Sequence, residues 1–99
     1  MKISDIKAGH RFAYKGFQFC KVKHGAPFNE TEHCYHHIDS DEECKPMVSI
    51  LDIKVGDCFY EADEMILYKR VSEDMAQAVK FDQLTFHINK RSLKQVVPA

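Results

Sequence analysis

One short stretch of the chain concentrates the side chains that bind zinc. It contains three histidines and two cysteines: His33, Cys34, His36, His37 and Cys44. Zn²⁺ takes four nitrogen or sulfur ligands in a tetrahedron. Cys34, His36 and Cys44 are the residues that would face one side of an extended chain, and Cys20 is the candidate fourth ligand. The sequence therefore allows a zinc-stabilised module.

The spacing of these residues argues against a standard zinc site. No paired C-x-x-C knuckle is present, and the pattern matches no zinc finger or ribbon. Cysteine also behaves as a small buried hydrophobe. We therefore favour core positions for Cys34 and Cys44 and keep zinc as the alternative. No other cofactor is expected.

The same part of the chain is strongly acidic. Residues 28–44 contain six carboxylates and no Lys or Arg. The six are Glu30, Glu32, Asp39, Asp41, Glu42 and Glu43. Such a loop can meet a basic surface on a partner protein, including a nucleic-acid-binding groove, and compete there with phosphate. For any single carboxylate a solvated surface loop is an equally good interpretation, but the six together are the candidate partner-binding residues.

Catalysis is not predicted. The chain has no serine nucleophile elbow, no phosphate-binding glycine loop and no H-E-x-x-H motif. Cys34 and His36 could be drawn as a nucleophile and its base, but neighbouring same-face positions on a strand more often pack than react. We therefore expect a protein without enzymatic activity.

Composition and charge are those of an ordinary small globular protein. The 99 residues are 44% hydrophobic and 29% charged, with a formal net charge of −1. No global charge therefore attracts nucleic acid or an anionic membrane. No apolar run approaches the roughly 18–20 residues that span a bilayer, and the first residues do not read as a signal peptide. We expect a cytoplasmic protein that does not bind membranes and whose four cysteines are reduced.

A small nucleic-acid-binding β-barrel is the main alternative function. Basic and aromatic residues lie close together in the second half of the chain: Lys80, Lys90, Arg91 and Lys94 near Phe81 and Phe86. Small barrels bind single strands with residues of these types. Phe86 alternates with polar neighbours, however, which is typical of a core position, and the acidic stretch would repel phosphate.

A repeated phrase determines the architecture that we expect. Residues 3–12 and 50–59 are identical at six of ten positions, which indicates an internal repeat. The repeat divides the chain into two tandem modules, 1–48 and 49–99. A β module of roughly 50 residues is too small to bury much core alone. We expect an all-β protein in which the modules pack as SH3-like half-barrels or as one small pseudo-symmetric barrel.

Alternating apolar residues and turn signals predict the strands. Residues 10–14 and 17–23 should form a hairpin around a turn at Lys15–Gly16. The other predicted elements are strands at 33–38, 44–48, 57–60, 65–71, 78–81, 84–88 and 93–97, a helical turn within 72–78, and an extended lead-in at 3–8. Gly9 and Gly56 should be bends with positive φ. Alignment of the two closing strands pairs Cys44 with Leu93, which suggests a core position for both.

Two phrases carry a resemblance to a known kind of protein. Ile-Lys-Ala-Gly-His-Arg-Phe-Ala-Tyr-Lys-Gly-Phe-Gln-Phe and Ile-Lys-Val-Gly-Asp-Cys-Phe-Tyr resemble the strand-turn-strand opening of small tandem-repeat β proteins encoded by bacteriophages and mobile elements. The stretch from Ala78 to Phe86 is similar to the way such modules close. The resemblance implies binding of a host protein, in some cases inhibition of a host defence system. It implies no catalytic residue.

We therefore predict a cytoplasmic, non-enzymatic protein-binding module, of the type of a phage inhibitor of a host defence or nucleic-acid-processing protein. The partner would be a host protein. Nucleic acid is the alternative partner, and a zinc-stabilised module is the second alternative function. The sequence does not determine the oligomeric state.

Overall fold

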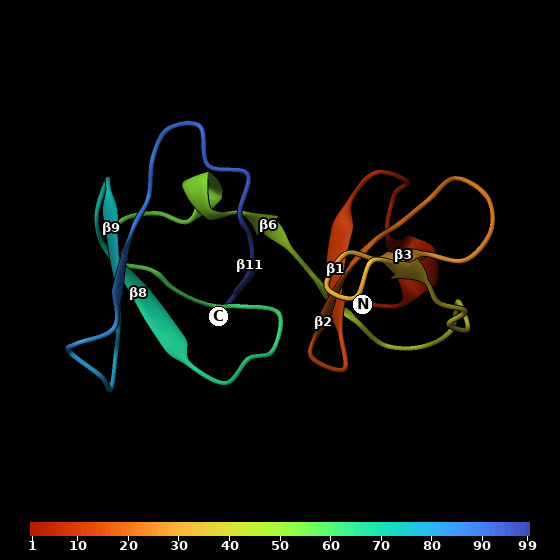
Figure 1. Cartoon of the computed structure of the whole chain (residues 1–99), viewed down its shortest axis with the longest axis horizontal. Helices are drawn as coiled ribbons and strands as arrows, with labels where there is room; N and C mark the ends of the chain where they lie inside the picture. Colours follow the sequence, from red (N-terminus) through yellow and green to blue (C-terminus); the bar gives the residue numbers. More distant parts are fainter. The chain divides into compact units, whose positions relative to one another are not determined.

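A computed structural model describes residues 1–99 (Figure 1). The chain divides into two compact units, Met1–Met47 and Val48–Ala99. Each unit contains one antiparallel sheet, and the only helical segments are two three-residue 3₁₀ turns. The all-β prediction is therefore confirmed. No helix has the length and apolar character that crossing a bilayer would take.

The first unit is a five-stranded antiparallel sheet. Its elements are η1 (Ile3–Asp5), β1 (Arg11–Tyr14), β2 (Phe17–Cys20), β3 (Phe28–Asn29), β4 (Cys34–Tyr35) and β5 (Lys45–Pro46), and its strand order is β4-β3-β2-β1-β5. The predicted hairpin is present. Lys15 and Gly16 at its turn have φ of 50° and 86°, and two positive φ angles are what a tight two-residue hairpin loop needs.

The second unit is a six-stranded antiparallel sheet. Its elements are β6 (Val48–Ser49), η2 (Ile50–Asp52), β7 (Cys58–Tyr60), β8 (Leu67–Ser72), β9 (Met75–Ala78), β10 (Thr85–His87) and β11 (Gln95–Pro98), and its strand order is β10-β9-β8-β7-β11-β6. The ribbons of β8 and β9 can be followed side by side in Figure 1. Strand β9 pairs with β8 on one side and with β10 on the other.

The repeated phrase forms a 3₁₀ turn rather than the extended lead-in that was expected. In η1 the N–H of Ile6 donates to the carbonyl of Ile3, and in η2 the N–H of Ile53 donates to that of Ile50. This turn lets both isoleucines of each phrase point into the core: Ile3 is 3% and Ile6 7% exposed. A straight strand would place residues three apart on opposite faces, so burial of both favours the turn.

The glycine bends are confirmed. Gly9 has a φ of +87° and Gly56 a φ of +97°, a region that side chains with a Cβ rarely adopt. The N–H of Gly9 donates to the carbonyl of Lys21 at 2.7 Å, and the N–H of Gly56 donates to that of Arg70 at 2.7 Å. Each bend is therefore hydrogen-bonded to the second strand of the hairpin that follows it, or to the residue just after that strand.

Neither sheet is closed into a ring, so the single small barrel, one of the two arrangements expected, is not formed. The edge strands are β4 and β5 in the first sheet and β10 and β6 in the second, and none of them pairs across to complete a ring. Barrel closure needs a continuous ladder around the whole sheet. These edge strands are only two or three residues long, which leaves too few backbone groups for such a ladder.

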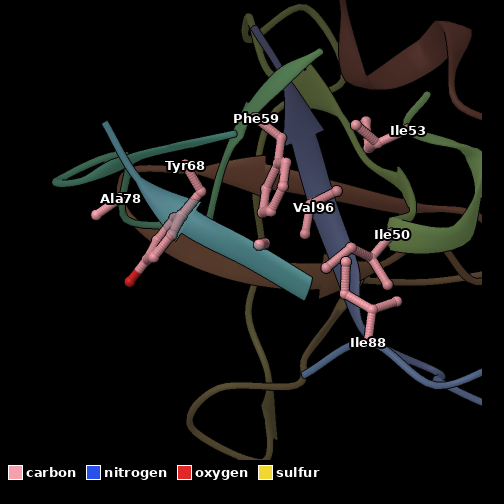
Figure 2. Close-up of a cluster of buried hydrophobic side chains, with 8 residues drawn as sticks. Ile50, Ile53, Phe59, Tyr68, Ala78, Ile88 and Val96 are labelled. Carbon is pink, nitrogen blue, oxygen red and sulfur yellow. The ribbon is translucent and has the colours of Figure 1, made fainter. Parts of the chain in front are cut away.

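Each unit has its own buried cluster. In the first unit it contains Ile3, Ile6, Phe12, Phe19 and Cys44. In the second it contains Ile50, Ile53, Phe59, Tyr68, Ala76, Ala78, Ile88 and Val96. Figure 2 shows Phe59 and Val96 in the middle of the second cluster, with Tyr68 on one side and Ile50 and Ile88 on the other. The hairpin rings stack in both, Phe12 on Phe19 at 5.4 Å and Phe59 on Tyr68 at 5.7 Å between centroids.

One helical and two strand predictions were wrong in whole or in part. The helical turn expected within 72–78 is strand β9, where Ala76 and Ala78 are buried and alternate with half-exposed neighbours. The strand expected at 78–81 overlaps β9 only at Ala78, because the chain bends at Val79 and Lys80 before the turn at Asp82 and Gln83. The strand expected at 33–38 is reduced to β4, since His33 has a φ of 57° that a strand does not tolerate.

The closing strands do not align as predicted. Pro46 lies opposite Phe12, and Pro98 lies opposite Phe59, so the matching strands are β5 and β11 in a different register. Leu93 is 92% exposed whereas Cys44 is 6% exposed. Cys44 is thus confirmed as a core residue, and the core assignment of Leu93 was wrong.

Candidate functional site

The hairpin of the first unit presents an aromatic face. Tyr14 pairs with Phe17 and Phe12 pairs with Phe19 across β1 and β2. Residues directly opposite in an antiparallel pair share one face of the sheet, so all four rings lie on the same side. Tyr14 packs edge-on against Phe19 with centroids 6.1 Å apart. Phe12 is fully buried while Tyr14 and Phe17 are half-buried, so the face remains partly open.

Asn29 in β3 lies on this same face, because it is paired with Phe19 of β2. It is the one buried polar residue, at 1% exposed. Its Oδ1 accepts hydrogen bonds from the backbone N–H groups of Thr31, at 3.0 Å, and Glu32, at 2.9 Å. This side-chain turn reverses the chain between β3 and β4.

Asn29 lines a hollow of about 330 Å³. Tyr14, Phe17 and Phe19 line it from the hairpin. His36, just after β4, also lines it, with its ring edge-on to Phe19 at 6.4 Å between centroids. The hollow is therefore lined by aromatic rings and by the buried side chain of Asn29.

Acidic side chains surround the mouth of this hollow. Three carboxylates, Glu32, Asp39 and Glu42, line it, and Lys15 is the only Lys or Arg that does so. We call these three carboxylates the acidic rim. All three are exposed. The N–H of Glu42 donates to the carbonyl of Asp39 at 3.0 Å, and this turn holds two members of the rim together.

Comparisons with protein families, with characterised proteins and with solved structures found no significant match to this chain. The site is therefore interpreted from its own geometry.

Two other predicted partner-binding residues lie close to the rim in sequence. Asp41 and Glu43 are exposed, and Asp41 lines a shallow surface depression together with Asp39 and Glu42. Glu43 accepts from the amino group of Met1 at 2.9 Å. The structure thus places five of the six predicted carboxylates on exposed segments after β3.

The sixth, Glu30, is placed differently. It is the first residue of the turn after β3. Its Oε1 accepts from Gln18 Nε2 at 3.0 Å and from Arg11 Nε at 3.2 Å, and these two residues lie on the other side of the sheet. Burial raises the pKa of the Glu30 carboxyl, but the hydrogen bonds from Gln18 and Arg11 and the charge of Arg11 outweigh it, so the pKa lies below its usual value. Glu30 therefore ties β1 and β2 to the segment after β3.

The candidate zinc ligands are not brought together. Cys34 is exposed on edge strand β4, so its predicted core position was wrong, whereas Cys44 is buried in the core. Burial raises the pKa of the Cys44 thiol, which disfavours the thiolate that metals bind. No three His, Cys, Asp or Glu side chains are arranged to hold a metal ion. Cys20 is half-buried, and all four cysteines are free thiols.

The basic strip of the second unit is only partly available. Phe86 packs edge-on against Phe59 and Tyr68, which supports its predicted core role. The ammonium of Lys94 lies 5.5 Å from the Phe86 ring centroid and 3.2 Å from a carboxylate oxygen of Glu61. Phe81 is 53% exposed and is the aromatic residue of this strip that a ligand could reach.

Sequence reasoning missed the two features on which the hollow depends. Asn29 was not singled out, although an asparagine next to a polar turn is a known signal for a side-chain-capped reversal. The aromatic wall was predicted only as a strand face. The hollow depends on the pairing of β3 with β2, which places Asn29 beside Phe19. No local sequence pattern predicts that pairing.

Proposed function

We propose that this chain is a non-enzymatic protein-binding protein whose contact surface is the acidic rim and aromatic hollow of the first unit. The observation that carries the proposal is the combination of three exposed carboxylates with an open aromatic hollow that contains a single lysine. Interfaces commonly join an aromatic centre to a polar margin. Negative charge at that margin fits a basic partner surface.

The two units differ in this surface in a way that supports the proposal. By register, Ala78 in β9 lies opposite Tyr68 as Asn29 lies opposite Phe19. In the second unit Phe86 packs edge-on against Tyr68 with centroids 5.1 Å apart, whereas in the first unit the exposed His36 makes the edge-on contact with Phe19 at 6.4 Å. We infer that the units are two copies of one β module and that the first copy acquired recognition in its β3–β4 region, since loops on a stable scaffold carry binding functions.

The matched strand pairings support that duplication. The pairs Phe12 with Phe19 and Phe59 with Tyr68 occupy the same register in their hairpins. The proline of the closing strand lies opposite the first phenylalanine of each pair. Because each sheet remains open, the proposed module resembles a half-barrel rather than a closed barrel.

We propose a cytoplasmic host protein with a basic surface as the partner, and inhibition as the consequence. An acidic surface that occupies a nucleic-acid-binding groove competes with phosphate for the same Lys and Arg side chains. A phage-type inhibitor of a nucleic-acid-processing protein would act in this way. Blocking a groove needs shape and charge but no catalytic group.

The test is capture of partner proteins from host lysate by the full chain and by two charge variants. The first variant neutralises the acidic rim with Glu32→Gln, Asp39→Asn and Glu42→Gln. The second is a control that removes the same charge from exposed positions of the second unit, with Asp52→Asn, Glu73→Gln and Asp82→Asn. We expect a partner captured by the wild type and the control, and about 10- to 100-fold weaker binding by the rim variant. Equal binding by both variants would remove the rim from the contact.

A second experiment tests nucleic acid as the other candidate ligand. Phe81 is exposed and follows Lys80 in the sequence, and this pair of residues favours that candidate. Fluorescent single-stranded oligonucleotides are titrated at rising salt concentration. Binding that falls steeply with salt, and that is lost in Phe81→Ala but kept in the rim variant, would assign function to the second unit instead. We expect no such binding, because the formal net charge of −1 gives no overall attraction to phosphate.

A further inference from the structure

Strand β10 forms an open edge of the second sheet. It is the first strand in the sheet order and pairs only with β9. The carbonyl of Leu84 and the N–H of Ile88, which flank β10, each make a hydrogen bond on the β9 side, at 2.9 and 2.7 Å. Backbone groups alternate in direction along an antiparallel strand, so the N–H and carbonyl groups of Thr85 and His87 point away from β9. Both residues are exposed, and these donors and acceptors therefore lie at the open edge.

The other edge strands offer fewer outward backbone groups. By the same alternation, Tyr35 is the outward residue of β4 and Ser49 that of β6. The outward residue of β5 is Pro46, and proline has no N–H to donate. Strand β10 is therefore the edge at which two successive outward residues can each exchange hydrogen bonds with an added strand.

The backbone of β10 is complementary to a second copy of itself. Two copies can pair antiparallel about a two-fold axis beside Phe86, with Thr85 of each copy opposite His87 of the other. The outward groups of these residues then exchange N–H and carbonyl hydrogen bonds in both pairs. A two-fold contact uses the same surface on both copies and closes on itself, so it gives a dimer rather than a fibre.

The side chains beside that axis are apolar. Phe86 is half-buried, with its ring edge-on to Phe59 and Tyr68 at 6.0 and 5.1 Å between centroids. Leu84 lies two residues before Phe86, so it shares the same face, and it is 41% exposed. In the paired dimer each Phe86 lies opposite its own copy, and cross-strand aromatic pairs stabilise a sheet. Pairing would therefore cover the partly exposed end of the second buried cluster.

The segments that flank β10 carry complementary charges. Asp82, which precedes the strand, is exposed and is the only carboxylate in residues 79–99. Lys90 and Arg91, which follow the strand, are also exposed. Lys80 precedes β10 as well, but it lines a hollow with residues of β7 and β8. Antiparallel pairing places the start of each β10 beside the end of the other, where the Asp82 carboxylate meets the two cations of the copy.

We propose that β10 is the interface of a homodimer in which the second sheets of two copies join edge to edge into one continuous sheet. The interface belongs to the second unit and adds self-association to the partner binding proposed for the first unit. A substitution that weakens the dimer, such as Asp82→Asn, leaves the acidic rim unaltered. Dimerisation and capture of a partner can therefore be measured separately.

The experiment is sedimentation equilibrium of the full chain over a wide range of protein concentrations. The contact is small, so we expect a reversible dimer with a dissociation constant on the order of 100 μM. Thr85→Pro removes an outward N–H and leaves the hydrogen bonds to β9 in place, since proline is tolerated at an edge where its nitrogen faces solvent. It should weaken dimerisation at least about tenfold.

The matched control is Tyr35→Pro, which makes the same kind of change at the open edge of the first sheet. It should dimerise as the wild type does. Circular dichroism of both proline variants checks that the sheets remain folded.

Two charge variants test the orientation of the copies. Asp82→Lys places like charges together at both ends of the interface, and so does the double variant Lys90→Glu with Arg91→Glu. Each should dimerise about three- to tenfold more weakly than the wild type. An equimolar mixture of the two should recover dimers, because both ends of the mixed dimer join opposite charges. Loss of folding in either variant would not produce that recovery.

Three results would overturn the interface. A wild-type chain that stays monomeric at millimolar concentration, or a Thr85→Pro variant that dimerises like the wild type, would exclude β10 as the contact. Charge variants whose mixture recovers no dimer would exclude the antiparallel pairing. If the wild type were monomeric but captured a host protein that Thr85→Pro lost, the edge would bind a strand of that protein and the homodimer would fall.

Discussion

The guanidinium of Arg11 donates to both oxygens of the Glu30 carboxylate, with Nε–Oε1 at 3.2 Å and Nη2–Oε2 at 3.4 Å. This fork joins β1 to the segment that follows β3, on the face opposite the hollow. The carboxylate side chain is 27% and the guanidinium side chain 40% exposed. A residue that looked like part of a recognition loop therefore stabilises the sheet that carries the loop.

Glu30→Gln should destabilise the protein at neutral pH and reduce its sensitivity to acid. The folded pKa of Glu30 lies below the ordinary value of 4.5, so its stabilising effect is present above that value and is lost as the pH falls through the folded pKa. For a pair this exposed we expect a loss of about 1 kcal/mol at pH 7. Chemical denaturation at pH 7 and at acidic pH measures the difference between wild type and variant.

The control for this prediction is Glu73→Gln, which removes an exposed carboxylate from the second unit. Its free energy of unfolding should match that of the wild type at both pH values. An unchanged stability of Glu30→Gln at pH 7 would contradict the role assigned to the Arg11 fork.

Gly9→Ala and Gly56→Ala should destabilise their units by similar amounts. No atom lies within 4 Å of the position where either Cβ would be placed, so the penalty is conformational and not steric. A side chain at these positive φ angles costs about 1–2 kcal/mol. Thermal unfolding of both variants measures it. Asparagine tolerates positive φ better than alanine, so Gly9→Asn should cost less than Gly9→Ala; the reverse order would argue against this explanation.

Cys34 should react with a thiol reagent much faster than Cys44. The first is exposed on an edge strand, whereas the second is 6% exposed and its pKa is raised by burial, and reaction needs an accessible thiolate. Mass spectrometry after timed alkylation gives the order. Added Zn²⁺ should not protect the two cysteines together. Protection of both cysteines from alkylation by Zn²⁺ would support the zinc-stabilised module. As a control, the two cysteines should be alkylated at equal rates in denaturant.

The separate fragments 1–47 and 48–99 should each be only marginally stable. Each has its own buried cluster, but a unit of roughly 50 residues buries too small a fraction of its surface for more than marginal stability. Circular dichroism during heating compares the fragments with the intact protein. A fragment that melted cooperatively at the temperature of the whole chain would show that its unit folds independently.

The local elements could be predicted because the signals for them are local. The hairpin around Lys15–Gly16 follows from period-2 alternation on both sides of a turn that allows positive φ. The bends at Gly9 and Gly56 follow from a residue type with no Cβ. The same local reasoning gave the all-β class. It failed within 72–78, where pairing of β9 with two neighbouring strands overrides a weak helical signal.

Only the tertiary structure decided which side chains share a face, because strand pairing joins residues that are far apart in the sequence. The pairing of β3 with β2 places the buried Asn29 beside Phe19. On the opposite side of the sheet, Glu30 accepts from Arg11. Pairing at the edge leaves Cys34 exposed, although composition suggested a core cysteine. By itself the sequence determined the first hairpin, the glycine bends and the acidic character of residues 28–44. The fold decided which of those acids surround a hollow.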